Sequence, residues 1–478
     1  MTTVLILFII IGLMGAFDTL YHHELKERLP WRPEVKSELK AHALRNVFYF
    51  TIFLSLAWVE WHGFFAWVFL AILVAEVFVT FSDFALESKV RTVPAPEIIV
   101  HTALGIVYGA TLAYLIPIVL DWSTLATDVA FVNYGLLSWI MSMYALAVLV
   151  FAFRDYFRAL EIDNFIQSYS MNLTQKKQKV LLTGGSGFIG SKIAQSLIDD
   201  GHEVSILTRN FKTTVEKFSK QIRLLSSLKD DETKYDIIIN LAGAAINQRW
   251  TKQSKEVILN SRLDVTEELI NYIERIDKKP KLLISSSGTG IYEASEEKEF
   301  TELSSLAEHS FTADVCKSWE AKAKEAEAYG VRVVTLRTGL VLATDGGILA
   351  EMLTAFDLCL AGKLGSGKQM MPWIDMQDML GIVEYVINNE TLKGAVNATA
   401  PKPVSNLAFS KTLAKAMRRP MSLTTPTFML ELFYGKEMVR ELLLKGRSVL
   451  PMKVQEHGYE FKFATLEQSM NNLFRKEK

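Results

Sequence analysis

The chain has 478 residues, of which 50% are hydrophobic, and a formal net charge of −1. The near-neutral charge predicts no nucleic-acid partner, and the two cysteines do not form a CxxC pair, which argues against a cysteine zinc site or a disulfide framework. The length predicts more than one domain. Residues 1–160 are mostly apolar with few charges, whereas 175–478 have the composition of an ordinary soluble protein.

The N-terminal part contains five apolar stretches, most of them long enough to cross a hydrocarbon core about 30 Å thick. They cover roughly 3–20, 44–59, 63–86, 98–120 and 131–153. The second is the shortest, and its helix is expected to start near Glu34. The first has no preceding Lys or Arg and no small-residue cleavage site, so it predicts a retained helix rather than a signal peptide. The sequence thus predicts an all-α transmembrane domain of five spans over 1–160.

The basic residues predict how this domain is oriented in the inner (cytoplasmic) membrane. All of them lie in the connections on one side, with none in the N-terminus, the expected turn 59–63 or the loop 121–130. These residues are Lys26, Arg28, Arg32, Lys36, Lys40, Arg45, Lys89, Arg91, Arg154 and Arg158. Because cytoplasmic loops are rich in Lys and Arg, we expect a multi-pass protein with its N-terminus outside and residues after 160 in the cytoplasm.

Ionisable residues gather where the predicted helices reach the cytoplasmic side. They are Asp18, His22, His23, Glu24, His42, Asp83, Glu87, Glu97 and His101. Glu76 lies about two turns deeper, where a carboxylate needs a partner or a proton. One interpretation is a polar pocket that holds a metal or haem, since His and carboxylates are common ligands. The other interpretation is that these residues cap helix ends and anchor the helices at the membrane interface. Their spacing matches no specific metal motif, and both interpretations stay open.

A nucleotide-binding motif follows the polar linker 161–178. A short apolar strand from Lys179 runs into glycines spaced GxxGxxG, and then come an amphipathic helix and a second strand over 202–209. Glycines let the backbone turn tightly and approach a pyrophosphate, and the helix N-terminus offers free N–H groups to its charge. Strand, glycines, helix and strand within about 30 residues predict a Rossmann domain, here over 179–344, with a C-terminal substrate or lid region over 345–478.

The end of the second strand predicts the cofactor. An acidic residue there would bind the ribose hydroxyl of NAD, but this chain has Thr208 and Arg209, with Lys212 nearby, and a cation suits the 2′-phosphate of NADP. NADP is therefore favoured over NAD. The residues expected to contact the cofactor are Gly184, Gly185, Ser186, Gly187, Phe188, Ile189, Gly190, Thr208, Arg209, Leu241, Ala242, Gly243 and Arg337.

Three further apolar segments predict buried parallel strands, at 236–240, 281–287 and 332–337. Helical segments separate them, which is typical of an α/β fold with a doubly wound parallel sheet.

From Lys179 to about Phe474 the chain resembles the epimerase-like atypical short-chain dehydrogenases, a branch of the extended family that contains nucleotide-sugar epimerases. The matching segments are 183–190, 240–243, 249–251, 261–264, 336–342, 364–369, 373–374 and 396–401, and the tail 443–451 is similar to the small C-terminal domain of that branch. The resemblance implies an NAD(P)-binding fold. It does not extend to the N-terminal apolar part.

The resemblance carries over only part of the catalytic machinery. Extended short-chain dehydrogenases use a Ser/Thr and a Tyr-x-x-x-Lys pair, but the corresponding segment 311–320 has no tyrosine, as in the atypical branch, and the chain has no Tyr-x-x-x-Lys. Ser287 and Tyr292 remain as the catalytic candidates that the resemblance implies. A phenol with a pKa near ~10 needs a cation to act as a base, and Lys317 and Arg249 are candidates. Alternatively, Tyr292 only packs over the cofactor.

A second departure from the family is Asp375, where relatives often have a histidine after Trp-Ile, so no role of that histidine carries over. The first functional hypothesis is a membrane-anchored NADP-dependent oxidoreductase or epimerase-like enzyme that acts on a small-molecule substrate; a substrate associated with the bilayer would explain the membrane tether. The second is a non-catalytic NADP(H)-binding sensor or scaffold. A third is electron transfer from NADPH to a haem or metal in the bundle. The missing Tyr/Lys pair favours the sensor, and the retained serine and tyrosine favour the enzyme.

Overall fold

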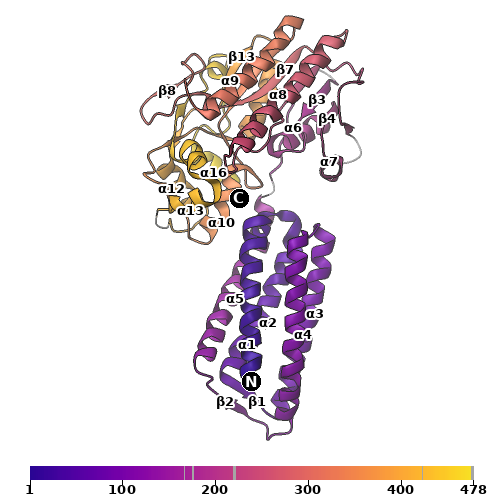
Figure 1. The fold of residues 1–478 in the computed structure, drawn as a ribbon, viewed down its shortest axis with the longest axis vertical. Helices are drawn as coiled ribbons and strands as arrows, with labels where there is room; N and C mark the ends of the chain where they lie inside the picture. The colour runs from indigo at the N-terminus through magenta and orange to yellow at the C-terminus, as the bar shows by residue number, and fades with distance from the viewer. Residues whose placement is uncertain (166, 175–176, 219–221, 422–423, 475–478) are drawn as a thin grey trace. The chain divides into compact units, whose positions relative to one another are not determined.

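The computed structural model describes the chain except for residues 166, 175–176, 219–221, 422–423 and 475–478. The chain divides into two compact units, Met1–Ile166 and Gln167–Lys478. The first is all α apart from one short strand pair, and the second is α/β (Figure 1).

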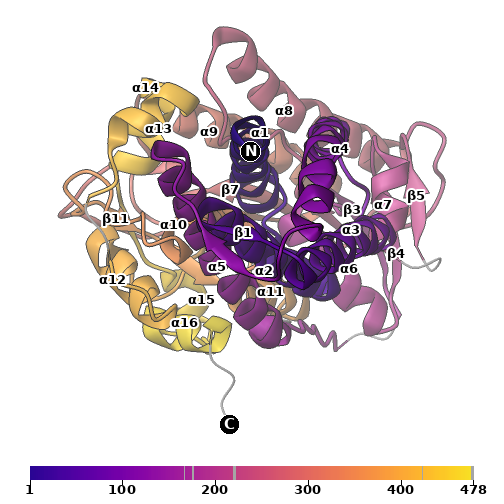
Figure 2. The ribbon, with the colours of Figure 1, turned by 90° about the horizontal axis from the view of Figure 1, so that it is seen from below.

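The first unit is a bundle of five long helices. They are α1 (Thr2–Phe17), which continues into the π-helix η1 (Asp18–Lys26), α2 (Lys36–Trp58), α3 (Phe64–Val90), α4 (Ala95–Ser123) and α5 (Leu136–Glu161). Seen along its length in Figure 2, the bundle has α2 next to both α3 and α5. Large side chains fill the interior; Phe8 of α1 meets Phe53 of α2 edge to face, with 5.6 Å between ring centroids.

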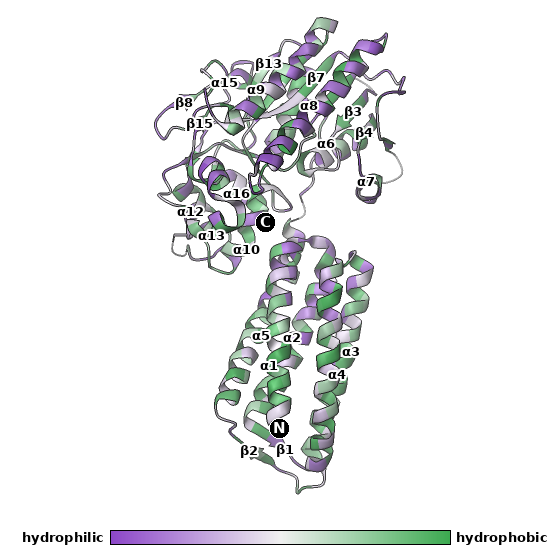
Figure 3. Ribbon diagram, in the orientation of Figure 1, coloured by the Kyte–Doolittle hydropathy of each residue, from purple (hydrophilic) through white to green (hydrophobic). Residues whose placement is uncertain are grey.

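Four segments among the described residues are long and apolar enough to cross a membrane. They are Thr2–Trp31, Phe64–Val90, Ala95–Ser123 and Leu136–Glu161. Figure 3 shows that hydrophobic residues cover most of the length of these helices. Helix α2 is not among them, because His42, Arg45 and Asn46 interrupt its apolar run and leave only its second half apolar. Four segments could thus cross a membrane by length and composition, and the five-span membrane domain stays a prediction.

The connections between α2 and α3 and between α4 and α5 are more ordered than the sequence predicts. The segment predicted as a plain turn, 59–63, contains the strand β1 (Val59–Trp61), which pairs antiparallel with β2 (Val129–Phe131). The pairing links two connections that are about 70 residues apart in sequence. It also gives partners to backbone N–H and C=O groups of the connecting residues, which no helix satisfies.

A parallel sheet of seven strands, in the order β13-β9-β7-β6-β3-β4-β5, forms the centre of the second unit. The strands are β3 (Lys179–Thr183), β4 (Glu203–Leu207), β5 (Arg223–Leu225), β6 (Ile237–Asn240), β7 (Leu282–Gly288), β9 (Arg332–Thr338) and β13 (Gly394–Ala398). All five strands expected from the sequence form. The strand order reverses between β3 and β6, and open α/β sheets bind ligands at the carboxyl ends of the strands at such a point.

Alternate residues of each strand pack under helices on opposite faces of the sheet. Val180 and Leu182 of β3 join the core beneath α6 (Phe188–Asp199) and α11 (Met376–Asn388). Leu181 points the other way, into a core shared with α8 (Lys252–Arg275). Helix α9 (Phe311–Lys324) packs beside α8 on that face (Figure 1). Burial on both faces explains why these strands are continuously apolar.

The range predicted as the C-terminal region contributes to this sheet as well as to a smaller subdomain, because β13 and α11 belong to the Rossmann layers. The smaller subdomain consists of short helices and two-residue strands. Its helices are α12 (Asn406–Ala416), α13 (Thr427–Tyr434), α14 (Lys436–Met438), η7 (Val439–Leu444), α15 (Met452–Glu456) and α16 (Leu466–Phe474).

Candidate functional site

The glycine-rich loop between β3 and α6 forms a tight turn that only glycines fit. Gly184 has a φ of +68°, and a Cβ there would lie 2.8 Å from the carbonyl carbon of Leu241. A Cβ on Gly190 would lie 2.3 Å from the carbonyl oxygen of Gly184. These contacts bring the first turn of α6 directly against the loop and the end of β3.

The outer side of the same loop is open. A Cβ on Gly187 would have one neighbour within 4 Å, the Gly184 oxygen at 3.1 Å. Helix α6 starts at Phe188, and no side chain caps its N-terminus at Gly187, a part of the chain that the structure fully describes. The N–H groups of the first turn and the positive end of the helix dipole therefore face open space beside Gly187. This arrangement fits the pyrophosphate of a dinucleotide.

Cations gather where β4 ends beside this loop. Arg209 is exposed and follows Thr208 directly after β4. Helix α7 (Phe211–Lys217), which Asn210 caps through a 3.3 Å bond from the Thr213 N–H, ends with Lys217. The Lys217 ammonium donates a 2.6 Å hydrogen bond to the Ser186 carbonyl in the glycine loop. The sequence pointed to Arg209 but not to Lys217, because only the fold of α7 brings it back to the loop.

The end of β6 forms the other wall of the site. Thr183 donates to the Asn240 side-chain oxygen (2.7 Å) and accepts from the Ala242 N–H (3.2 Å), which holds the segment 241–243 beside the glycine loop. Arg262 of α8 reaches Gly243, where a Cβ would lie 2.8 Å from its guanidinium carbon. Burial lowers the pKa of Arg262. The predicted cofactor residues of the first, second and third strands thus lie at one edge of the sheet.

Ser287 and Tyr292 belong to a buried polar network. The Ser287 hydroxyl donates to Glu320 of α9 (2.7 Å), and Glu320 accepts two bonds of 2.9 Å from Arg337 of β9. Arg337 also donates to the Tyr292 hydroxyl (2.8 Å), which itself donates to Asn397 of β13 (2.7 Å). The network joins strands β7, β9 and β13 to α9.

This placement favours a packing role for Tyr292. Its side chain is 0% exposed, and burial raises the pKa of its hydroxyl, so deprotonation near neutral pH is disfavoured. The cation beside it is Arg337, which the sequence suggested as a cofactor ligand and which here pairs with Glu320. Lys317 instead donates to the carbonyls of Ala307 and Glu308. The catalytic roles of Ser287 and Tyr292 and the cofactor contact of Arg337 stay predictions.

Helix α9 occupies the position of the family's Tyr-x-x-x-Lys segment and brings different groups to β7. Besides Glu320 it carries Cys316, whose sulfur would lie 3.6 Å from a Cβ on Gly288. Burial raises the pKa of the Cys316 thiol, which keeps it protonated and unreactive at neutral pH. Neither group replaces a tyrosine as a phenolic acid or base.

Asp375, at the position where relatives often have a histidine, has a structural role in this chain. It caps α11 by accepting from the Gln377 N–H (2.8 Å), and it accepts a 2.6 Å bond from Ser469 of α16. Burial raises its pKa to about 6. The Asp375 carboxyl therefore binds a proton more tightly in the folded chain than in the unfolded chain, where its pKa is near ~3.9. As a result, the free energy of unfolding falls as pH rises from about 4 to 6.

We expect Asp375→Asn to remove this component of the pH dependence, because an amide keeps the bond from Gln377 without a charge to desolvate. The gain in stability above pH 6 is about 1.4 kcal/mol for each unit of the pKa shift. The measurement is the midpoint temperature of thermal unfolding at several pH values between 4 and 8. The transition to follow is the one that NADPH shifts. Asp277→Asn, at an exposed position, is the matched control. An unchanged pH profile in Asp375→Asn would contradict the assignment.

Comparisons with known proteins agree with this geometry. Residues 180–398 match the NAD dependent epimerase/dehydratase family, and 425–473 match a domain of unknown function, DUF1731. The epimerase family protein YfhF of Bacillus subtilis is 35% identical over 62% of this chain and 97% of its own length. The epimerase family protein SAR0825 of Staphylococcus aureus is 33% identical over 63% of this chain and 100% of its own length.

Solved structures show the same fold. The human epimerase family protein SDR39U1, in a crystal structure with NADPH, is 29% identical and superposes with a TM-score of 0.57 over 63% of this chain and 100% of the human chain. A nucleoside-diphosphate sugar epimerase from Corynebacterium glutamicum, 23% identical with a TM-score of 0.51 over 72% of this chain and 67% of its own, supports the fold alone. The sheet, the glycine loop and these relatives together show that the chain belongs to the epimerase family of NAD(P)-binding proteins related to the short-chain dehydrogenases.

Proposed function

We propose that the second unit binds NADP(H) and acts as an NADP-dependent oxidoreductase or epimerase-like enzyme on a small-molecule substrate, held at the membrane by the N-terminal bundle. The observation that carries the proposal is the loop 184–190, which is open at Gly187 and has Arg209 and Lys217 beside it. When bound, the nicotinamide supplies the hydride chemistry. The substrate would enter between the strand ends and the C-terminal subdomain.

NADP is favoured over NAD because Arg209, Lys212 and Lys217 place positive charge at the end of β4, where the adenosine ribose of a dinucleotide lies in this fold. A cation pairs with the 2′-phosphate that distinguishes the two cofactors. The NADPH in the structure of the human relative is consistent with this preference.

Arg209→Asp is expected to weaken NADPH binding by about ten- to a hundred-fold, which corresponds to the loss of roughly one or two charge-assisted hydrogen bonds. NADH binding should be unchanged or improved, because aspartate can accept from the ribose hydroxyl. The dissociation constants are measured by titrating both cofactors into detergent-purified protein. Lys229→Gln, at an exposed position in another loop, is the matched control. Equal affinities of the unmutated protein for NADPH and NADH would contradict the assignment.

A non-catalytic NADP(H) sensor is the second candidate. The observations that favour it are the absence of a Tyr-x-x-x-Lys pair in the sequence and the full burial of Tyr292. Ser287→Ala distinguishes the two. An enzyme should oxidise NADPH in the presence of a small-molecule or lipid extract, and the variant should lower the rate while keeping the dissociation constant. A sensor should bind NADPH tightly without turnover in either extract.

The proposed topology has five spans, with the N-terminus outside and the second unit in the cytoplasm. Helix α2 is included because it packs along α5 and α3 within the bundle, and an odd number of spans agrees with the one-sided basic residues. Reporter fusions after Asp121 and after Gln178 are expected on opposite sides of the membrane. Fusions before Arg28 and after Gln178 should report the same side, and any other pattern would contradict the five spans.

A further inference from the structure

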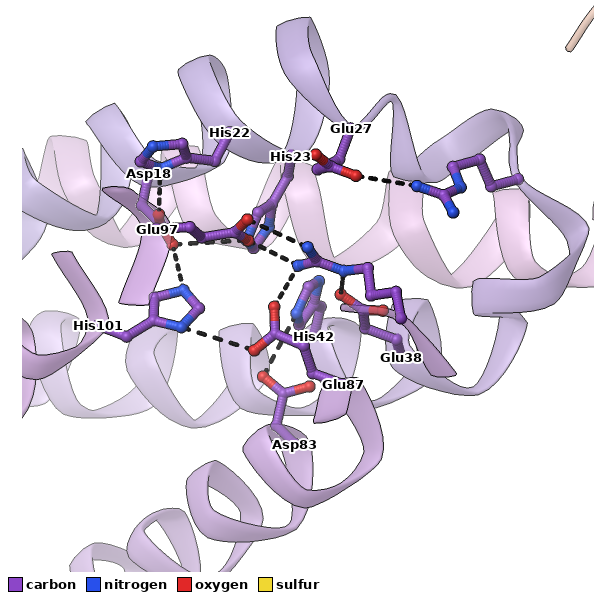
Figure 4. A network of polar contacts seen from close by, with 12 residues as sticks. Asp18, His22, His23, Glu27, Glu38, His42, Asp83, Glu87, Glu97 and His101 are labelled. Atoms are coloured by element: carbon purple, nitrogen blue, oxygen red, sulfur yellow. Dashed lines mark hydrogen bonds and ion pairs between the residues drawn. The ribbon is translucent and has the colours of Figure 1, made fainter. Parts of the chain in front are cut away.

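The first unit contains a buried network of charged side chains at the ends of its helices (Figure 4). Four of its members converge: Asp18, His23, Glu97 and His101 each offer one oxygen or nitrogen atom, and these four atoms lie within 4.8 Å of one another. Asp18, His23 and Glu97 are at most 5% exposed, and His101 is partly buried. The four donors come from η1 and α4, which are far apart in sequence.

The helical geometry of η1 and α4 brings these four donors together. Glu97 and His101 are four residues apart on the α-helix α4 and so share a face. Asp18 and His23 are five residues apart, a spacing that an α-helix would separate, but η1 is a π-helix with i→i+5 hydrogen bonds. A π-helix of nine residues is rare and costs backbone stability, and π-helical segments occur frequently at functional sites.

Three of the six distances between the donor atoms are close to those of a coordination shell, and the others are at most 4.8 Å. Four ligands at ~2.1 Å from a tetrahedral ion are about 3.4 Å from one another. Asp18 Oδ2 lies 3.0 Å from His101 Nε2 and 3.5 Å from His23 Nε2, and His23 Nε2 lies 3.3 Å from Glu97 Oε1. Among the described residues, His23 Nε2 makes no hydrogen bond of good geometry, although it is buried and directed at both carboxylates.

The neighbouring side chains hold the donors in a manner typical of metal sites. His101 turns its other ring nitrogen, Nδ1, towards Glu87 at 3.5 Å. His22 lies 2.8 Å from the second oxygen of Asp18. Arg91 donates to both oxygens of Glu97 through its two terminal guanidinium nitrogens, which leaves a lone pair of each oxygen for another partner. Metal-binding histidines commonly donate their second N–H to a carboxylate, which fixes the ring orientation.

The network carries more negative than positive side chains. Its buried carboxylates are Asp18, Glu38, Asp83, Glu87 and Glu97. The guanidinium groups that pair with them are those of Arg45 and Arg91, so five acids face two arginines. Unbalanced charges are costly to bury, and near a membrane the cost is larger still. A dication at the four donors would supply two of the missing positive charges, and protons on the histidines are the alternative.

We propose that Asp18, His23, Glu97 and His101 bind a divalent transition-metal ion of the kind that imidazole and carboxylate hold together, such as Zn²⁺, Fe²⁺ or Mn²⁺. The site joins η1 to α4 and uses Glu87 as a positioning residue. His42 is not a ligand in this arrangement; it stacks on His23 with 4.7 Å between ring centroids and faces Asp83.

The test is metal analysis of the full chain purified in detergent, stripped with a chelator and reloaded separately with Zn²⁺, Mn²⁺ or Fe²⁺. About one tightly bound ion per chain is expected. His101→Gln and Asp18→Asn should each lose it, whereas Glu87→Gln should keep the stoichiometry at saturation and bind about ten- to a hundred-fold more weakly. His62→Gln is the matched control, because His62 contacts a carboxylate, Glu60, at 3.2 Å at the other end of the bundle.

Monodisperse elution in detergent and the helical content measured by circular dichroism check that the bundle of each variant is folded. If the ligand variants fail to fold, the unmutated chain still decides the matter: loading the stripped protein with Co²⁺ should produce the visible absorption of a four-coordinate site, and metal should raise the midpoint of thermal unfolding. The proposal is overturned if the unmutated protein binds none of these ions, or if His101→Gln binds them as tightly as His62→Gln does. In either case protons balance the carboxylates.

Discussion

Replacing Gly190 with alanine is expected to weaken NADPH binding by about ten- to a hundred-fold and to lower the midpoint of thermal unfolding. The added Cβ would lie 2.3 Å from the Gly184 oxygen, a backbone atom, so α6 must move away from the loop. Overpacking of this kind costs about 1–3 kcal/mol, and the movement displaces the N–H groups that face the pyrophosphate. The measurements are a cofactor titration and an unfolding curve of the detergent-purified chain.

Gly187→Ala separates the two effects of that substitution. Its Cβ would meet only the Gly184 oxygen, at 3.1 Å, which needs a shift of a few tenths of an ångström, so the protein without cofactor should lose far less stability than Gly190→Ala. The methyl group would still occupy the open space where the phosphates are expected, and NADPH binding should weaken. If Gly187→Ala binds NADPH with unchanged affinity, the cofactor does not lie against this loop.

Replacing Glu320 with alanine is expected to destabilise the second unit by about 3–5 kcal/mol, because it leaves Arg337 buried without its carboxylate partner. The two side chains are 15% and 7% exposed and share two bonds of 2.9 Å. Ser287 would lose its acceptor at the same time. Denaturant unfolding monitored through the NADPH-sensitive transition measures the change.

Glu325→Gln is the control, since its pair with Lys322 lies at the surface and should contribute at most about 1 kcal/mol. Removing both partners of the buried pair, as in Glu320→Leu with Arg337→Met, should cost less than Glu320→Ala alone, because no unpaired charge remains. If Glu320→Ala is no more destabilising than Glu325→Gln, the network contributes little to stability. In that case the burial of Tyr292 needs another explanation.

The sequence by itself determined the elements that depend on local pattern. The run 179–190 specifies a strand, a glycine turn and a helix because spacing and composition suffice, and the apolar segments at 236–240, 281–287 and 332–337 all become strands of the sheet. The helices of the first unit were also foreseeable, because long apolar runs have few alternatives to helix in a membrane. Arg209 at the end of β4 could be located in the same way.

Only the tertiary structure decided which side chains meet across distant elements. Lys217 approaches the glycine loop because α7 folds back. The network of Ser287, Glu320, Arg337 and Tyr292 joins β7, α9, β9 and, through Asn397, β13, whose order in sequence says nothing of their contacts. The polar cluster of the first unit could be anticipated from helix ends, but the spacing of Asp18 and His23 fits no α-helical face. It became a set of four converging donors only through the π-helical backbone of η1, because a change from α to π rotates each following side chain about the axis.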